Sequence, residues 1–220
     1  MNLSILYRGP LSSCNYACGY CPFAKRAESR AELAGDRACL ERFVGWVGAR
    51  TDDRVGVLFT PWGEALVRPW YQRALAELTR RPNVTKAAIQ TNLSCKLDWV
   101  EGCDKGKLAL WCTYHPGETS RARFLAKCRE LLGRGVRFSV GVVGLKEHLA
   151  EIAALRAELP PDVYLWVNAY KRGDRAEEPT PNPSLQGGEQ EPLRALNVLD
   201  ARDATGAVSP LPFREGGPGG

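Results

Sequence analysis

A short loop near the N-terminus reads Cys14-Asn15-Tyr16-Ala17-Cys18-Gly19-Tyr20-Cys21-Pro22. It follows the first strand-like run of the chain, Leu3–Tyr7. The three cysteines are separated by three and by two residues, a spacing that suits three corners of an iron–sulfur cube. A [4Fe–4S] cluster held entirely by protein takes four cysteines, so three leave one iron open to another ligand.

Two other chemistries explain these thiols less well. A zinc site needs a fourth ligand, and neither His115 nor His148 is adjacent in the sequence. A disulfide does not account for three clustered thiols in a reducing compartment. The remaining cysteines show no metal spacing and are expected to be inert: Cys39, Cys95, Cys103, Cys112 and Cys128.

Strand-like and helical patterns alternate around this loop up to Tyr170. The expected strands are Leu3–Tyr7, Val55–Thr60, Thr85–Thr91, Leu108–Tyr114, Val136–Val143 and Val163–Ala169. They are apolar on both sides, as in a parallel sheet that is buried on both faces. The expected helices are Asp36–Ala49, Val67–Arg80, Ser120–Leu132 and Lys146–Glu158, with a weaker pattern at Leu97–Gly102. Such alternation predicts right-handed crossovers and a parallel sheet, here an open partial (β/α)6 barrel. The working residues of such barrels lie where the strands end.

The pattern stops after Tyr170. Residues 171–220 are rich in proline and glycine, contain no cysteine and have one aromatic residue, Phe213. Such a segment buries too little apolar surface to offset its ordering entropy, so we expect a core domain at 1–170 and a mostly disordered tail at 171–220. The composition of the tail resembles a truncated or frameshifted reading frame.

The composition sets limits on location and partners. The chain has 220 residues, of which 44% are hydrophobic, which excludes wholesale disorder. It shows neither a signal-peptide pattern nor an apolar run of roughly 20 residues that could span a bilayer. We therefore expect a cytoplasmic protein with no membrane partner. The net charge of +5 is spread along the chain, which makes nucleic acid an unlikely partner.

The cysteine loop, with Tyr20 directly before the third cysteine, resembles the signature of the radical SAM superfamily over about residues 1–170. The resemblance implies that Cys14, Cys18 and Cys21 ligate a [4Fe–4S] cluster. It further implies that S-adenosylmethionine (SAM) binds the open iron and is cleaved reductively to a 5′-deoxyadenosyl radical. The cofactor carries the radical chemistry, and the protein orients the reactants. A low-potential electron donor, flavodoxin or ferredoxin, is implied as a partner.

The resemblance also assigns residues to SAM. The stretch Thr60-Pro61-Trp62-Gly63-Glu64 is similar to the family's Gly-Gly-Glu motif, so Gly63 and Glu64 are expected to meet the SAM ammonium group. Trp62 departs from the motif, because it stands in place of the first glycine. The alternative for this stretch is a plain strand-to-helix turn.

Further positions follow the later strands. Asn92 is expected near cofactor or substrate, or else as a helix cap, and Thr113 near the SAM ribose or carboxylate. His115 is either a substrate-side acid or base or an exposed loop residue. Tyr20 is expected near the adenine. The stretch Val140-Gly141-Val142-Val143-Gly144-Leu145-Lys146-Glu147 resembles the family's Gly-x-Ile-x-Gly-x-x-Glu pattern. The resemblance implies that Gly144 and Glu147 shape the adenine end of the site, where the glycines let the backbone approach a flat ring.

Three functions therefore remain open. The first is a radical SAM enzyme acting on an unknown substrate. The second is a truncated barrel that binds cluster and SAM without turnover. The third, a basic metal-stabilised nucleic-acid binder, lacks an aromatic-and-basic groove pattern in the sequence.

Overall fold

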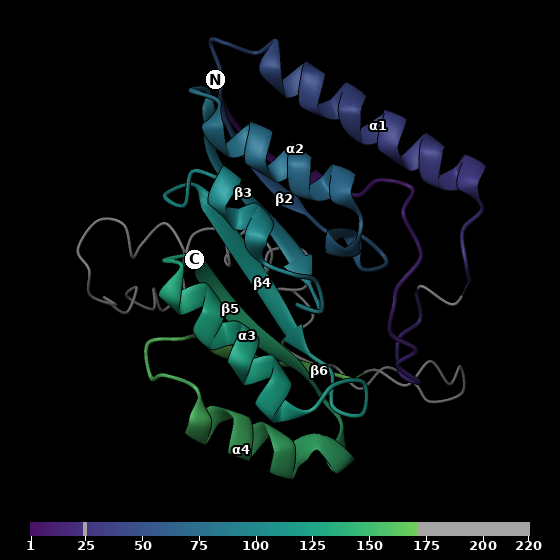
Figure 1. The fold of residues 1–220 in the computed structure, drawn as a ribbon, viewed down its shortest axis with the longest axis vertical. Coiled ribbons are helices and arrows are strands. Elements are labelled where there is room, and N and C mark those ends of the chain that lie inside the picture. The colour runs from purple at the N-terminus through teal and green to yellow at the C-terminus, as the bar shows by residue number, and fades with distance from the viewer. Residues whose placement is uncertain (24–25, 171–220) are drawn as a thin grey trace, which may run out of the picture. The chain divides into compact units, whose positions relative to one another are not determined.

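A computed structural model describes residues 1–23 and 26–170, and the predicted tail at 171–220 lies outside the described residues. Six parallel strands form one sheet in the order of the sequence (Figure 1). They are β1 (Asn2–Tyr7), β2 (Arg54–Phe59), β3 (Val84–Thr91), β4 (Leu108–Tyr114), β5 (Arg137–Gly144) and β6 (Leu165–Ala169). The helices between them are α1 (Arg30–Gly48), α2 (Pro69–Arg80), α3 (Arg121–Gly133) and α4 (Leu149–Glu158). Short 3-10 turns are η1 (Ala65–Val67), η2 (Asp98–Gly102) and η3 (Lys146–His148).

The sheet curls into a half-barrel, which confirms the predicted open (β/α)6 fold. Helices α2 and α3 lie in front of the strands in the view of Figure 1. The core between sheet and helices is apolar and includes Phe59, Leu75, Leu78 and Ile89, each fully buried. Because every strand runs in the same direction, the loops that follow the strands gather at one end of the half-barrel.

Burial differs between the middle and the edges of the sheet. In β3 and β4 most residues are buried, as the continuous apolar runs predicted. In β1, exposed and half-buried residues alternate, and most of β6 is exposed. The sequence predicted apolar surroundings on both faces of all six strands, and this was wrong for the two outermost strands, each of which has one paired neighbour.

The helices depart most from the predicted ones in three places. Helix α1 begins six residues earlier than expected, because Ser29 and Glu32 form a reciprocal capping box that starts the helix at Arg30. The predicted helix at Lys146–Glu158 begins with the 3-10 turn η3 before α4. The weak pattern near Leu97–Gly102 is the 3-10 turn η2.

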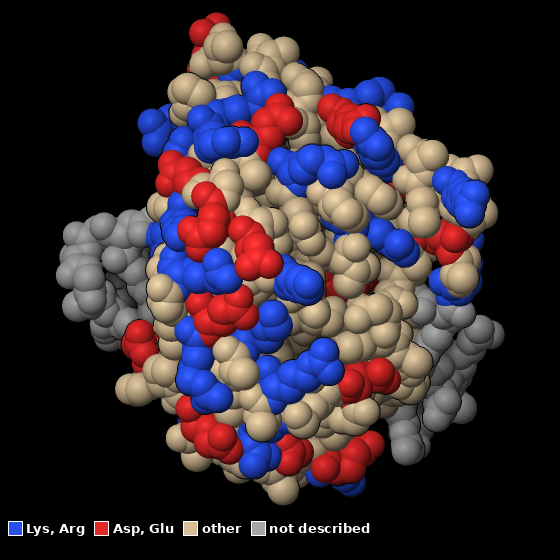
Figure 2. All heavy atoms as spheres, in the orientation of Figure 1, with Lys and Arg blue, Asp and Glu red and all other residues tan. Residues whose placement is uncertain are grey.

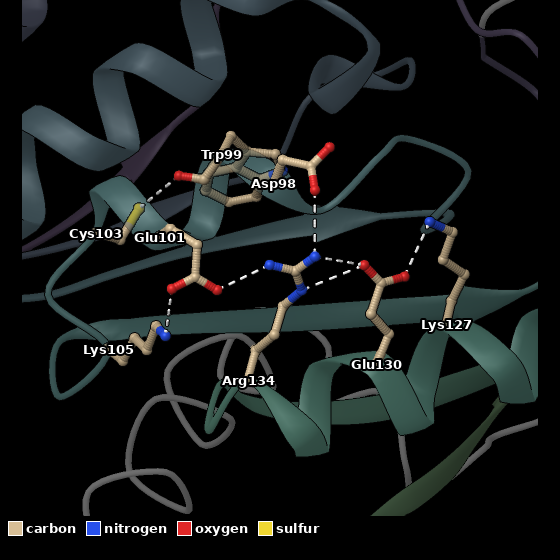
Figure 3. A network of polar contacts seen from close by, with 8 residues as sticks. All are labelled: Asp98, Trp99, Glu101, Cys103, Lys105, Lys127, Glu130 and Arg134. Carbon is tan, nitrogen blue, oxygen red and sulfur yellow. Dashed lines mark hydrogen bonds and ion pairs between the residues drawn. The ribbon is translucent and has the colours of Figure 1, made fainter.

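Ion pairs connect two segments at the end of the half-barrel where the strands begin. Arg134 follows α3 and contacts Asp98 and Glu101 of η2 at 3.2 and 2.8 Å, together with Glu130 at 3.0 Å (Figure 3). One guanidinium thus joins three carboxylates from two segments. Since its side chain is 25% exposed, the network is partly shielded from solvent.

On the face seen in Figure 2, basic and acidic side chains are interspersed. Among the described residues, no helix is long and apolar enough to cross a membrane.

Candidate functional site

A cavity of about 170 Å³ opens where the strands end. Its lining includes all three cysteines of the loop together with Gly63, Glu64, Asn92 and Thr113. These residues come from the cysteine loop and from the ends of β2, β3 and β4. The structure therefore brings together seven of the ten residues predicted for the site.

Ser13, directly before the first cysteine, anchors the cysteine loop. Its carbonyl accepts a hydrogen bond from the Glu64 N–H at 3.1 Å, and Arg68 donates to its hydroxyl at 2.9 Å. The carboxylate of Glu28, just ahead of α1, accepts from the backbone N–H groups of Ser12 and Ser13 at 3.0 and 3.2 Å. The loop is thus held at its base from two directions.

The hydrogen bonds that Glu28 accepts affect its pKa more than the desolvation of its carboxylate does. Burial alone would raise the pKa of the Glu28 carboxyl, but the bonds from Ser13 and Ser12 bring that pKa below its ordinary value. Glu28 is therefore ionised at neutral pH, and its negative charge strengthens the bonds that hold the loop.

Two nitrogen donors approach the sulfur of Cys14. The Tyr16 backbone N–H lies 3.4 Å from the Cys14 sulfur, and the Asn92 amide nitrogen lies 3.8 Å from it. Asn92 also donates to the side-chain oxygen of Asn15 at 3.1 Å, while its own oxygen accepts from the Ser94 N–H at 3.0 Å. Asn92 thus lines the cavity, and its expected place near cofactor or substrate stays a prediction. The alternative of a helix cap was wrong, because Leu97 is the N-cap of the following helical turn, η2.

Glu64 is a buried carboxylate at the wall of this cavity, with 2% of its surface exposed. It accepts from the Leu66 N–H at 3.0 Å, from the Thr91 hydroxyl at 2.8 Å and from the Asn92 N–H. Desolvation raises its pKa to about 7, although these hydrogen bonds pull the other way. Near neutral pH the carboxyl is thus poised between its two protonation states.

The backbone turn after β3 is strained. Leu93 has a φ of 59°, in the left-handed region that residues with a side chain avoid. Its N–H donates to the Thr91 hydroxyl at 3.0 Å, and its side chain is buried. This turn presents the Asn92 N–H to Glu64, so the unusual conformation holds two site residues together.

Cys18 lies against a histidine from a distant part of the chain. The Nδ1 atom of His115 is 3.4 Å from the Cys18 sulfur and 2.8 Å from the Tyr20 hydroxyl. The Tyr16 ring packs edge-on to His115, with ring centres 5.9 Å apart. Burial lowers the pKa of His115 to about 4, so the imidazole is neutral at neutral pH. His115 is therefore not the exposed loop residue that one interpretation of the sequence expected.

A second, more open cavity of about 860 Å³ shares Cys18 with the first. It is lined by Tyr20, Gly144 and Glu147, the three residues predicted for the adenine end, and by His148 and Tyr170. Tyr20 packs edge-on to both His148 and Tyr170. The ten predicted residues thus divide between two neighbouring cavities that meet at Cys18.

Residues of the neighbouring strand β6 pack closely against two glycines of β5. A Cβ at Gly141 would overlap the Trp166 ring of β6, and a Cβ at Gly144 would lie 2.9 Å from the Val167 side chain. The sequence suggested that these glycines let the backbone approach a flat ligand ring. For Gly141 the flat ring is a tryptophan of the neighbouring strand, so packing accounts for that glycine.

Trp62 contributes an exposed aromatic wall to the first cavity. Its ring stacks on Phe23, with centres 5.6 Å apart and planes inclined by 17°, and the two side chains are 48% and 46% exposed. Both line the cavity that holds the cysteines. The residue that departs from the family's motif therefore forms a rim together with the segment that follows Cys21.

The described residues contain no group of three or more His, Cys, Asp or Glu side chains arranged around a single metal ion. A cubane cluster makes a different demand, because each cysteine binds a separate iron. On that criterion the donor set fits: three thiols line one cavity, and nitrogen or hydroxyl groups lie against two of the sulfurs. Burial raises the pKa of Cys14 and raises that of Cys18 to about 11, so these thiols hold their protons until a metal displaces them.

Four residues that shape the site were not predicted for it: Ser13, Glu28, Arg68 and Phe23. Ser13 and Glu28 carry no motif, and their contact depends on the path of the loop between β1 and α1. A role for His115 as a substrate-side acid or base stays a prediction, and no signal in the sequence indicates its contact with Cys18, 97 residues away.

Comparisons with known proteins show the fold. No protein-family model and no curated protein sequence matches the chain. Among solved structures, anSMEcpe with bound AdoMet matches with a TM-score of 0.59 and 16% identity, over 83% of this chain and 53% of that one. A structure of anSMEcpe with bound AdoMet and Kp18Cys peptide matches with a TM-score of 0.58 and 17% identity, over 96% and 68% of the two chains. The chain thus spans about half to two thirds of the length of these structures, and at this level of identity the likeness is one of fold.

Proposed function

We propose that this chain is a cytoplasmic radical SAM enzyme that binds a [4Fe–4S] cluster through Cys14, Cys18 and Cys21. The observation that carries the proposal is the gathering of these three thiols in one cavity, beside a buried carboxylate, at the catalytic end of a half-barrel. The fold likeness to structures solved with AdoMet bound supports SAM as the ligand.

When bound, the cluster supplies the electron for the reductive cleavage of SAM. The chain's own residues orient the ligand. Glu64 would face the SAM ammonium group, and a cation at this position would favour the ionised form of a carboxyl whose pKa is about 7. The backbone at Gly63 closes that side of the cavity, and Asn92 and Thr113 offer polar groups from the next two strands.

The second cavity suits the adenosine end of the ligand. Tyr20 offers an aromatic face there, and Gly144 and Glu147 line the same wall. Because Cys18 borders both cavities, a ligand bound to the open iron would reach from one to the other. A low-potential flavodoxin or ferredoxin would supply the electron, and the substrate class stays open because the radical chemistry is shared among different reactions.

One experiment separates an enzyme from a barrel that binds without turnover. The protein is reconstituted anaerobically with iron and sulfide, reduced with dithionite and given SAM. Formation of 5′-deoxyadenosine supports the enzyme. A cluster whose spectrum changes with SAM, without that product, supports the alternative of a barrel without turnover. A protein that takes up no cluster contradicts both.

Matched variants make the test specific. Cys18→Ser should abolish cluster binding, because the serine hydroxyl is a poor ligand for iron in place of a thiolate. Cys39→Ser, on α1 and outside both cavities, should leave the iron content unchanged. Equal iron content in the two variants would contradict the assigned ligands.

A further inference from the structure

We propose that His115 and Tyr20 act together as positioning residues that direct a hydrogen bond to the Cys18 sulfur and so raise the reduction potential of the cluster. The inference rests on the proposed function, because it concerns a sulfur that would carry iron. It goes further by giving a role to His115, a residue to which neither the cysteine spacing nor the fold assigns one.

The first support is geometric. A single atom, Nδ1 of His115, lies 2.8 Å from the Tyr20 hydroxyl and 3.4 Å from the Cys18 sulfur. Both distances are within hydrogen-bonding range, the longer one being suited to sulfur. His115 stands at the end of β4, whereas Cys18 and Tyr20 belong to the cysteine loop. The contact therefore joins the loop to the sheet at the sulfur itself.

The distance also decides between two roles for the imidazole. A nitrogen that ligated the open iron would bind a different corner of the cube from the one that Cys18 holds. The Nδ1 atom of His115 instead lies within hydrogen-bonding range of the Cys18 sulfur, which is itself one of the proposed iron ligands. His115 is thus suited to act on the sulfur, in the way that partners behind metal ligands tune a metal site.

Iron binding determines the direction of the hydrogen bond. In the metal-free protein, both the Cys18 thiol and the Tyr20 hydroxyl can donate to a bare Nδ1. An iron-bound thiolate has no proton and only accepts. A loaded site therefore favours the tautomer with hydrogen on Nδ1. The Tyr20 oxygen and the Cys18 sulfur both accept from this N–H, at 2.8 and 3.4 Å, and the Tyr20 hydroxyl hydrogen is then free to point towards the sulfur, with which Tyr20 also forms a side-chain hydrogen bond.

The electrostatic consequence has a definite sign. Reduction adds one negative charge to the cluster and its thiolates. A hydrogen bond to a cluster sulfur stabilises the more negative form and raises the potential. Because a hydrogen bond to a charged acceptor is among the stronger ones, we expect a difference of about tenfold in the equilibrium constant for reduction. For a single electron, tenfold corresponds to ~59 mV.

The test is a redox titration of the reconstituted holoprotein, without SAM, followed by electron paramagnetic resonance. His115→Leu should make the cluster about tenfold harder to reduce, and Tyr20→Phe should shift the potential in the same direction. His115→Asn, whose amide nitrogen can occupy the place of Nδ1, should restore part of the shift. His148→Gln is the matched control, since His148 packs on Tyr20 but its Nδ1 lies beside the Val143 carbonyl. The His148→Gln variant should therefore have the same cluster potential as the wild type.

A measurement on unaltered protein keeps the inference testable if a variant fails to fold. With ¹⁵N-labelled histidine, the reduced wild-type cluster should show a weak nitrogen hyperfine coupling, and the same coupling should persist in His148→Gln. A strong coupling typical of a direct ligand, or no coupling, would overturn the inference. So would unchanged potentials in His115→Leu and Tyr20→Phe at full cluster content. Wild-type protein that never acquires a cluster would overturn the proposed function as well, which distinguishes the two failures.

Discussion

The backbone carbonyl of Ser13 lies directly against the Cα atom of Gly63, and a Cβ at position 63 would overlap that carbonyl. The neighbouring Glu64 N–H donates to the same oxygen at 3.1 Å. The base of the cysteine loop thus rests on the loop that follows β2. Gly63 is required there for the close approach of two backbones, whatever it contributes to a ligand.

Gly63→Ala should destabilise the protein, because the atom that the new methyl group meets is a backbone carbonyl, which cannot rotate away as a side chain can. We expect the free energy of unfolding in urea to fall by roughly 1–3 kcal/mol. Gly19→Ala, within the cysteine loop, is the control, since a Cβ there meets nothing within 4 Å. Equal stability of the two variants would show that the close approach is absent.

Glu28→Gln should loosen the base of the cysteine loop. The amide keeps the shape of the carboxylate but loses the charge that strengthens its bonds to Ser12 and Ser13, a loss of about 1–3 kcal/mol. Hydrogen exchange of the Ser12 and Ser13 amides should become faster. Glu41→Gln removes an exposed carboxylate of α1 that pairs with Arg37, and it should leave those two amides as they are. Unaltered exchange in Glu28→Gln would show that Glu28 does not anchor the loop.

Glu64 should make the stability of the cluster-free protein depend on pH. Its pKa is raised from 4.5 to about 7 in the folded state, so the folded protein holds a proton that the unfolded chain releases. The associated stability is complete below about pH 4.5 and is lost as the pH rises through 7, to an extent of ~3 kcal/mol. Urea unfolding between pH 4.5 and 8 measures it. Glu64→Gln should flatten this pH dependence, and a slope that persists in the variant would point to another group.

Arg134→Ala should lower stability without affecting the site. The network in Figure 3 lies in the segments that lead into β4 and β5, whereas the cysteine loop follows the end of β1. In a parallel sheet these are opposite ends of the strands, and the network is partly exposed. We expect a small loss that shrinks at high salt, as for a screened group of ion pairs. Iron content after reconstitution should equal that of the wild type. A loss of iron together with stability would contradict the separation of the two regions.

The fold was predictable because its signals are local. Continuous apolar runs in the middle strands and the alternation with helical patterns depend on residues near one another in the sequence, and β3 and β4 follow them closely. The start of α1 was missed because it is specified by the capping box at Ser29 and Glu32 instead of an apolar face.

The site was predictable where a motif marks it and unpredictable where only the path of the chain does. Cys14, Cys18 and Cys21 are grouped by their spacing alone. The contacts of Glu28 with Ser13 and of His115 with Cys18 join residues 15 and 97 positions apart, and no periodicity announces them. At Gly141 a family motif suggested a ligand contact where the structure has internal packing. The ring that lies against this glycine is that of Trp166.

The most direct test of the central claim is the electron paramagnetic resonance spectrum of the reconstituted, dithionite-reduced protein, recorded with and without SAM. We predict the signal of a reduced [4Fe–4S] cluster in the wild type, a change in its shape when SAM is added, and no such signal when Cys14, Cys18 and Cys21 are all replaced by serine. A cluster signal that survives the triple replacement, or a wild-type signal that saturating SAM leaves unchanged, would contradict the account.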